Sequence, residues 1–343
     1  MKAKKLGAFL LAAVMGMSVL TGCGSSINAD AVGATLEGEE ISLGFMNFMA
    51  RYQQAIYDGY YSSMFGSDFW SQDLYGNGSD MVTTVKDQTT ENIEILYLLE
   101  DHMKDYDVTV TKEEMTAIDK AAKQFMSDNT KTAIAQVGAT EEYVKEMLRL
   151  NTIQKKMKDA MNQEVDTNVT DEEAAQKTFS YVKVNKTSTT DAEGKTVDYT
   201  DAEKAELTKS IEGFAQNAKT DLDAAAKTAG YTVSTYSYGI DESSFDKEVI
   251  AAVDALEEGQ MTSLLDTKEN YYIARLDSTF DVEKTTAKKE SIVTKRQEEH
   301  YTQICDGYKK GITYKVKKEE WKKVKFDDLF TVKQETTKDA AGK

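Results

Sequence analysis

Residues 269–276 read ENYYIARL, and this stretch decides how the second half of the chain is interpreted. Polar and apolar positions roughly alternate in it, which is typical of a short β-strand. Two adjacent tyrosines, Tyr271 and Tyr272, stand in the middle of the predicted strand. Whether Tyr272 is ordinary packing or occupies the position of a catalytic residue depends on the sequence around it.

The part of the chain before residue 165 is predicted to be almost wholly helical. A strand at 31–36 and a turn at Gly38 lead to Ser42, which is a predicted helix cap. Thr111 and Glu114 have the spacing of a capping box. Apolar residues recur at helical spacing in the segments that follow. The predicted helices cover residues 43–61, 82–104, 111–128 and 140–162.

The pattern changes after Thr170, which opens another capping box. Strands and helices now follow one another, so this region is predicted to be a small mixed α/β unit. The predicted elements are a strand at 179–184, a polar loop at 187–200, helices at 201–217, 221–228 and 245–256, and the strand at 269–276. A long charged helix at 283–309 and a strand at 311–316 come last.

Two predicted strands, 31–36 and 311–316, have no partner close to them in the sequence. Pairing them with each other would return the end of the chain to the first domain. The region 170–281 would then be an insertion between two parts of one helical domain.

The N-terminus has the pattern of a secretion signal. Lys2, Lys4 and Lys5 precede an apolar run from Leu6 to Leu20, which is shorter than the roughly 20 residues that a membrane span needs. The run ends in LTGC at residues 20–23. This resembles the signal peptide and lipobox of bacterial lipoproteins, which implies cleavage before Cys23 and lipidation of its thiol. An ordinary signal peptide with a coincidental cysteine is the alternative.

Charge and cysteine content limit the function classes. The net charge is −17, and removal of residues 1–22 takes away three lysines and no acid, so it becomes −20. Such a chain has no electrostatic attraction to nucleic acid or to an anionic membrane, and attachment would come from lipid on Cys23. Cys305 is then the remaining cysteine, so no intramolecular disulfide is expected. We expect Cys305 to act as a small apolar side chain on a helix.

Several motifs, taken in order, resemble the PrsA/SurA group of extracytoplasmic foldases, which carry a parvulin-type peptidyl-prolyl isomerase domain. They are the lipobox at Cys23, ATLEGEEIS at 34–42, VGATEEYVKE at 137–146 and VTDEE at 169–173. The likeness covers nearly the whole chain after the signal peptide.

This resemblance implies an α+β fold, in which a mostly helical SurA-N-like chaperone domain is closed by N- and C-terminal strands and holds an inserted parvulin-like α/β domain. The implied boundaries are a signal peptide at 1–22, a tether at 23–30, the helical domain at 31–168 plus 282–332, the parvulin-like domain at 169–281 and a disordered tail at 333–343.

The catalytic positions of the parvulin family are altered in this chain. The first strand of such domains carries a histidine where this sequence has Tyr181, and Tyr272 stands at the second histidine position. Both histidines of the chain, His102 and His300, lie outside this unit. Prolyl isomerisation must cross a barrier of roughly 18–20 kcal/mol, which an enzyme lowers by hydrogen bonds that strengthen as the amide twists. A tyrosine hydroxyl donates and accepts, so Tyr272 is open to three roles: packing, peptide contact or catalytic help.

A binding surface is also predicted, in the aromatic segment 45–75. Tyrosine and methionine at 57–65 suit loose recognition of many apolar sequences. The predicted peptide-binding residues are Tyr57, Tyr60, Tyr61, Met64 and Phe65 in this segment, together with Phe245 near the proline slot. Simple packing and a partner interface are the alternatives, and a homodimer through this segment is compatible with the pattern.

Three functions follow from these patterns. The first is a lipid-anchored foldase at the outer face of a bacterial cell membrane that binds unfolded secreted polypeptides through a degenerate isomerase unit. The second is a working peptidyl-prolyl isomerase with an altered site, and the third is a substrate-binding or adhesion lipoprotein. No metal or other cofactor is expected, because two isolated histidines make no ligand cluster.

Overall fold

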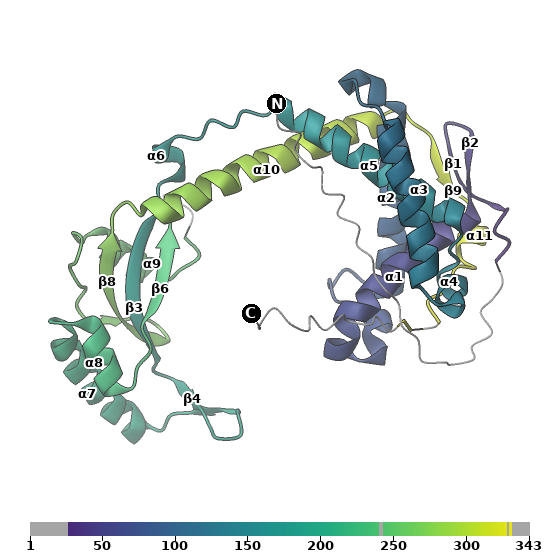
Figure 1. The fold of residues 1–343 in the computed structure, drawn as a ribbon. Coiled ribbons are helices and arrows are strands. Elements are labelled where there is room, and N and C mark those ends of the chain that lie inside the picture. The colour runs from purple at the N-terminus through teal and green to yellow at the C-terminus, as the bar shows by residue number, and fades with distance from the viewer. Residues whose placement is uncertain (1–26, 240–242, 328, 331–343) are drawn as a thin grey trace, which may run out of the picture. The chain divides into compact units, whose positions relative to one another are not determined.

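The computed structural model describes residues 27–239, 243–327 and 329–330, except for the side chains of residues 62–64 and 67 (Figure 1). The chain divides into two compact units. One unit combines Met1–Glu164 with Glu299–Lys343, and the other is Val165–Glu298. No helix within the described ranges has both the length and the apolar character needed to cross a bilayer.

The first unit is built mainly from helices. They are α1 (Leu43–Phe65), α2 (Met81–Asp101), α3 (Lys112–Asp128), α4 (Lys131–Val137), α5 (Glu141–Met161), the last part of α10 (Val282–Lys309) and α11 (Lys318–Trp321). Single 3₁₀ turns η1 (Ser67–Ser71), η2 (Met103–Tyr106) and η3 (Asn162–Glu164) extend this set. The capping box of Thr111 and Glu114 is confirmed, because both reciprocal hydrogen bonds are present.

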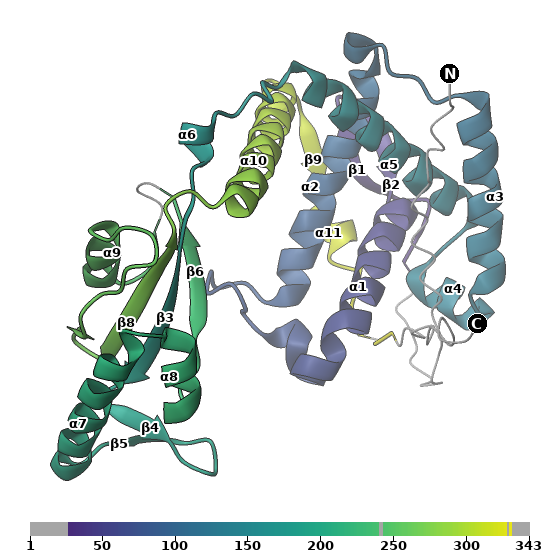
Figure 2. The same ribbon diagram turned by 60° about the vertical axis from the view of Figure 1, so that its left-hand side comes forward.

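The two ends of the first unit meet in one small sheet. Its strand order is β2 (Glu39–Ser42), β1 (Val32–Leu36) and β9 (Tyr314–Val316), and the three strands lie side by side in both views (Figures 1 and 2). Ala34 pairs with Val316 in an antiparallel register. The predicted pairing of the two isolated strands is confirmed, and with it the predicted fold class of a helical domain interrupted by an insertion.

One predicted boundary in this unit was wrong, and one short helix was not predicted. Helix α1 continues beyond the predicted end at residue 61 to Phe65. Helix α4 was not predicted, since its seven residues are too few for a periodic pattern; Thr130 caps it and Gly138 ends it with a positive φ of 68°. Ser42 belongs to β2, yet its hydroxyl accepts a hydrogen bond from Phe45 N at 3.2 Å, so its predicted capping role is confirmed.

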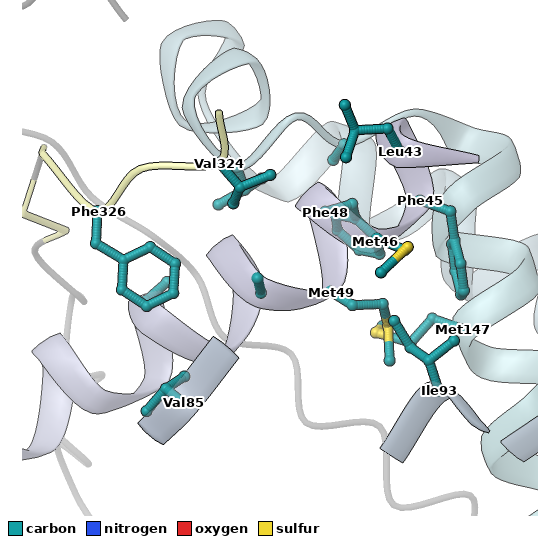
Figure 3. Close-up of a cluster of buried hydrophobic side chains, with 14 of the residues drawn as sticks. Leu43, Phe45, Met46, Phe48, Met49, Val85, Ile93, Met147, Val324 and Phe326 are labelled. Atoms are coloured by element: carbon teal, nitrogen blue, oxygen red, sulfur yellow. The ribbon is translucent and has the colours of Figure 1, made fainter. Parts of the chain in front are cut away.

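The core of the first unit surrounds α1, which buries side chains on several sides. Figure 3 shows Phe45, Met46, Phe48 and Met49 of this helix between residues from other elements. These neighbours include Ile93 of α2 and Met147 of α5, with Val324 and Phe326 from the end of the chain. An α-helix that is apolar on several faces must be enclosed, and Val324 and Phe326 supply part of that enclosure.

A buried polar network fixes Lys325 and Phe330 against α1. The Asp58 carboxylate accepts from Trp70 Nε1 at 2.8 Å, from Phe330 N at 2.9 Å and from Gln54 Nε2 at 3.3 Å. Burial raises the pKa of Asp58, although these donors and Arg51 favour the charged form. Arg51 in turn donates to Lys325 O at 2.8 Å and to Gln54 Oε1 at 2.6 Å.

The second unit contains a four-stranded antiparallel sheet in the order β6-β3-β8-β7. The strands are β3 (Lys177–Asn185), β6 (Ser234–Tyr238), β7 (Leu265–Asp266) and β8 (Asn270–Ser278). The helices are α6 (Asp171–Ala174), α7 (Asp201–Ala218), α8 (Leu222–Ala229), α9 (Lys247–Asp254) and the first part of α10. The strands predicted at 179–184 and 269–276 are thus confirmed as β3 and β8.

Each face of this sheet has its own core, as expected for alternating side chains. Val182 and Ile273 pack with Ile211 and Phe214 of α7 on one face. Phe179 and Tyr272 pack with Val249 and Val253 of α9 on the other. The predicted polar loop at 187–200 instead contains a short hairpin, β4 (Ser188–Thr190) with β5 (Thr196–Asp198), and strand β6 was missed.

Replacing Asp58 by alanine tests the network that holds Phe330 against α1. The change leaves the Trp70 indole N–H and the Phe330 amide buried without an acceptor, so the free energy of unfolding should fall by about 3 kcal/mol. Urea unfolding measures this fall. The exposed Asp87→Ala in α2 is the matched control and should change stability by less than about 0.5 kcal/mol. Equal effects of the two substitutions would contradict the proposed importance of the network.

Candidate functional site

The second unit brings Tyr181 and Tyr272 onto one face of its sheet. Tyr181 of β3 pairs with Ala274 of β8, so Tyr272 lies diagonally next to it on the same face. Their ring centroids are 6.2 Å apart. The structure therefore places the two residues together, as their positions in the sequence predicted.

Phe245, from the segment before α9, lies at the centre of this aromatic group. Its ring centroid is 4.9 Å from that of Tyr181 and 5.7 Å from that of Tyr272, both in edge-to-face geometry. It also contacts the rings of Phe179 at 5.3 Å and Tyr236 at 4.7 Å. Such pairs add about 0.5–1.5 kcal/mol beyond the burial of area, so the group is a firm apolar wall.

Sequence reasoning missed the contribution of β6 to this wall. Tyr236 and Tyr238 come from β6, and Tyr238 donates its hydroxyl hydrogen to Asp254 of α9 at 2.8 Å. Asp254 also pairs with Lys177 at 2.6 Å. The alternation of STYSY at 234–238 was the available signal, because hydroxyl and aromatic residues at period two are typical of a strand.

The polar groups that Tyr181, Tyr236 and Tyr272 bring to this aromatic group are phenolic hydroxyls. Tyr272 is buried, and burial, followed by Asp246 and Tyr181, raises its pKa. Tyr236 differs, because hydrogen bonds from Ser244 lower its pKa. The Lys183 ammonium lies 5.9 Å from the centroid of the Tyr272 ring. The group thus combines apolar ring surface with phenolic hydroxyls, which can donate and accept hydrogen bonds.

A second aromatic surface lies in the first unit, at the C-terminal end of α1 and in η1. We call Tyr57, Tyr61, Phe65 and Phe69 the aromatic row. Tyr61 stacks on Phe69 with centroids 5.6 Å apart and planes inclined by 9°, and Phe65 follows Tyr61 at 6.2 Å. Tyr57 contacts Tyr61 at 5.6 Å.

The row is open to solvent on one side. Tyr61 and Phe65 are each 39% exposed, while Phe69 beneath them is buried. Tyr60, at the same end of α1, is 67% exposed, and Tyr75 is 61% exposed. Exposed large apolar side chains gathered at one place are typical of a protein-binding surface. Met64 lies in α1 within this region, but its side chain is outside the described part of the structure.

The other residues singled out in the sequence are the two cysteines, Cys305 and Cys23. Cys305 is buried against Met157 and Met161, and burial raises the pKa of its thiol, which agrees with its predicted role as a small apolar side chain. Cys23, the predicted lipidation site, lies outside the described residues, as does the predicted tail at 333–343. No group of three or more metal-ligating side chains occurs among the residues that the structure describes.

Comparison with protein families identifies the second unit. Residues 169–288 match the model of the PPIC-type PPIase domain. The chain therefore contains a parvulin-type domain, and this part of the resemblance is confirmed. The comparison with curated protein sequences found no matching relative.

Solved structures similar to this chain include foldases and chaperones. The foldase PrsA of Lactococcus lactis shares 16% identity over 86% of this chain and 97% of its own, with a TM-score of 0.32. PrsA of Bacillus cereus shares 20% identity over 72% and 93%, with a TM-score of 0.31. A SurA-like chaperone of Campylobacter jejuni shares 12% over 83% and 99%, with a TM-score of 0.29. At these values the likenesses assign no role to any residue here.

The raised pKa of Tyr272 predicts how stability depends on pH. The folded state keeps the phenolic proton at pH values where the unfolded chain, with a pKa of 10.0, has lost it. This stabilisation is complete below that pH and is lost as the pH rises through the raised pKa. The free energy of unfolding should therefore fall more steeply above about pH 10 in the wild type than in Tyr272→Phe. Parallel pH profiles of the two proteins in urea unfolding would contradict the assignment.

Proposed function

We propose that this protein is a membrane-anchored extracytoplasmic foldase that holds unfolded secreted polypeptides. The observation that supports it is the aromatic row, since Tyr61 and Phe65 offer apolar surface to solvent in a chain with a parvulin-type domain. Lipidation of Cys23 would anchor the chain, and two or more acyl chains supply stable attachment.

The parvulin-type domain takes part as a peptide-binding unit with a degenerate isomerase site. Its aromatic wall retains the apolar surface that a proline ring needs. The paired imidazoles are replaced by Tyr181 and Tyr272, and a phenol whose pKa is raised by burial exchanges protons less readily near neutral pH. Binding survives such a replacement more easily than catalysis, because apolar contact needs no proton donor.

A second candidate, an active isomerase with an altered site, is favoured by one observation. The rings of Tyr181, Phe245 and Tyr272 converge on one face of the sheet, where the family's residues would act. In that case a phenolic hydroxyl would donate to the amide nitrogen as the bond twists. The third candidate, a substrate-binding lipoprotein, is favoured by no feature of the described residues.

The aromatic row is tested by an aggregation assay with an unfolded secreted protein as client. Tyr61→Ser/Phe65→Ser should raise the concentration of the chain needed for half suppression by about threefold or more, as expected for loss of two interface aromatics. Phe280→Ser, an equally exposed phenylalanine in the second unit at 40%, is the matched control and should behave as the wild type. Equal suppression of aggregation by the wild type and both variants would show that the aromatic row does not bind the client.

Exchange spectroscopy on X-Pro peptides separates the two roles of the parvulin-type domain. The chain from residue 24 should shift peptide resonances without accelerating cis–trans exchange, because no imidazole is present at the site. Acceleration that Tyr272→Phe abolishes would establish the second candidate and show that a phenol has taken over the role of a histidine. Tyr75→Phe, outside this domain, controls for nonspecific effects of removing a hydroxyl.

A further inference from the structure

The last described residues of the chain are bound to the helical unit in the way that a protein binds a peptide. Residues 321–330, which we call the C-terminal segment, have no regular structure from Val324 onward among their described residues. Main-chain groups in such a segment need hydrogen-bond partners from elsewhere when they are buried. Side chains of α1 and α2 provide them.

Three side chains form hydrogen bonds with the main chain of this segment. Lys86 of α2 donates to Trp321 O at 2.8 Å and to Val324 O at 2.9 Å. Arg51 donates to Lys325 O at 2.8 Å, and Asp58 accepts from Phe330 N at 2.9 Å. Contacts with carbonyl and amide groups do not depend on which side chains the bound segment carries, so they suit many sequences.

Apolar anchors supply the rest of the binding. Trp321, Val324, Phe326 and Phe330 are buried, whereas Leu329 between the last two is 47% exposed. The Phe326 ring meets Trp70 edge to face at 4.9 Å, and the Arg51 guanidinium lies 4.8 Å from the centroid of Phe330. Two aromatic residues four positions apart thus enter separate sites, and the two described residues between them, Asp327 and Leu329, are exposed and add little.

The binding site of the C-terminal segment continues directly into the aromatic row. Trp70, which holds Phe326, contacts Phe69 at 5.0 Å and Tyr57 at 6.0 Å. From Phe69 the contacts run on to Tyr61 and Phe65, which are open to solvent. One continuous aromatic surface is therefore covered at one end by the chain itself and exposed at the other.

We infer that the part of the C-terminal segment that carries Phe326 and Phe330 is a resident ligand of a peptide-binding surface on α1, α2 and η1, and that the client segments of the proposed foldase replace it. The segments that fit carry two aromatic residues four positions apart in an irregular or extended stretch. Such a client refills the sites of Phe326 and Phe330 and offers its own amide to Asp58, so the exchange leaves no buried group unpaired. This inference rests on the proposed function and specifies the class of client.

The test uses a fluorescent peptide with the chain's own sequence 322–332, KKVKFDDLFTV, and measures anisotropy. Phe326→Ala/Phe330→Ala in the full chain from residue 24 empties both anchor sites and should bind the peptide at least tenfold more tightly than the wild type. Asp327→Ala/Leu329→Ala changes exposed residues of the same segment and should bind like the wild type. A peptide with both phenylalanines replaced by serine should bind none of the three.

Equal affinity of the wild type and the Phe326→Ala/Phe330→Ala variant for the peptide would overturn the inference. If that variant does not melt cooperatively, hydrogen exchange of the wild type decides instead. Saturating peptide should accelerate exchange of the amides at 324–330 several-fold and leave those of α5 unchanged, and unaltered exchange at 324–330 would overturn the inference. Suppression of client aggregation by the wild type is measured alongside, so that the foldase proposal and this inference can fail separately.

Discussion

The antiparallel pairing of β1 with β9 is the constraint on which the rest of the structure depends. It joins Ala34 to Val316 and so closes almost the whole chain into one loop. The entropy cost of closing a loop grows only with the logarithm of its length, and a unit that folds within the loop shortens the flexible part of it. The sheet of the parvulin-type unit pairs strands within residues 177–278, so it can form before the ends meet. The insertion is thus compatible with a helical unit made from two distant pieces.

The pairing of β1 with β9 also determines which surface of the helical unit is available to a partner. The residues that follow β9 lie against α1 and α2. There the side chains of Arg51, Lys86 and Asp58 form hydrogen bonds with their main-chain groups. Burying charged groups is costly unless their hydrogen-bonding capacity is used, and the main chain of the C-terminal segment adds to the partners that these three side chains have. The same groups that stabilise the fold therefore make a surface that recognises backbone, next to an aromatic row that recognises apolar side chains.

Much of this could be read from the sequence, for particular physical reasons. Strand β8 and the partnership of β1 with β9 were predictable because alternation, and the lack of any nearby partner, are visible in a single sequence. The meeting of Tyr181, Phe245 and Tyr272 followed from the parvulin-like pattern. The network of Arg51 and Asp58 could not be predicted, because its partners at Lys325 and Phe330 are more than 270 positions away and lie in a segment without periodicity. Helix α4 was missed because its seven residues show too few repeats, whereas the alternation that marks β6 was present at 234–238 and was not used.

An exposed aromatic surface is also a hazard, since it invites copies of the chain to associate. The net charge of −17 opposes this, because like-charged copies repel one another over distances comparable with the Debye length, about 8 Å at physiological ionic strength. Unfolded clients without such an excess of acidic groups feel no comparable repulsion. Aromatic contact without strong charge attraction gives weak binding that is easily reversed, and a protein that must release its clients for folding needs that property. The composition and the surface thus each agree with the proposed function.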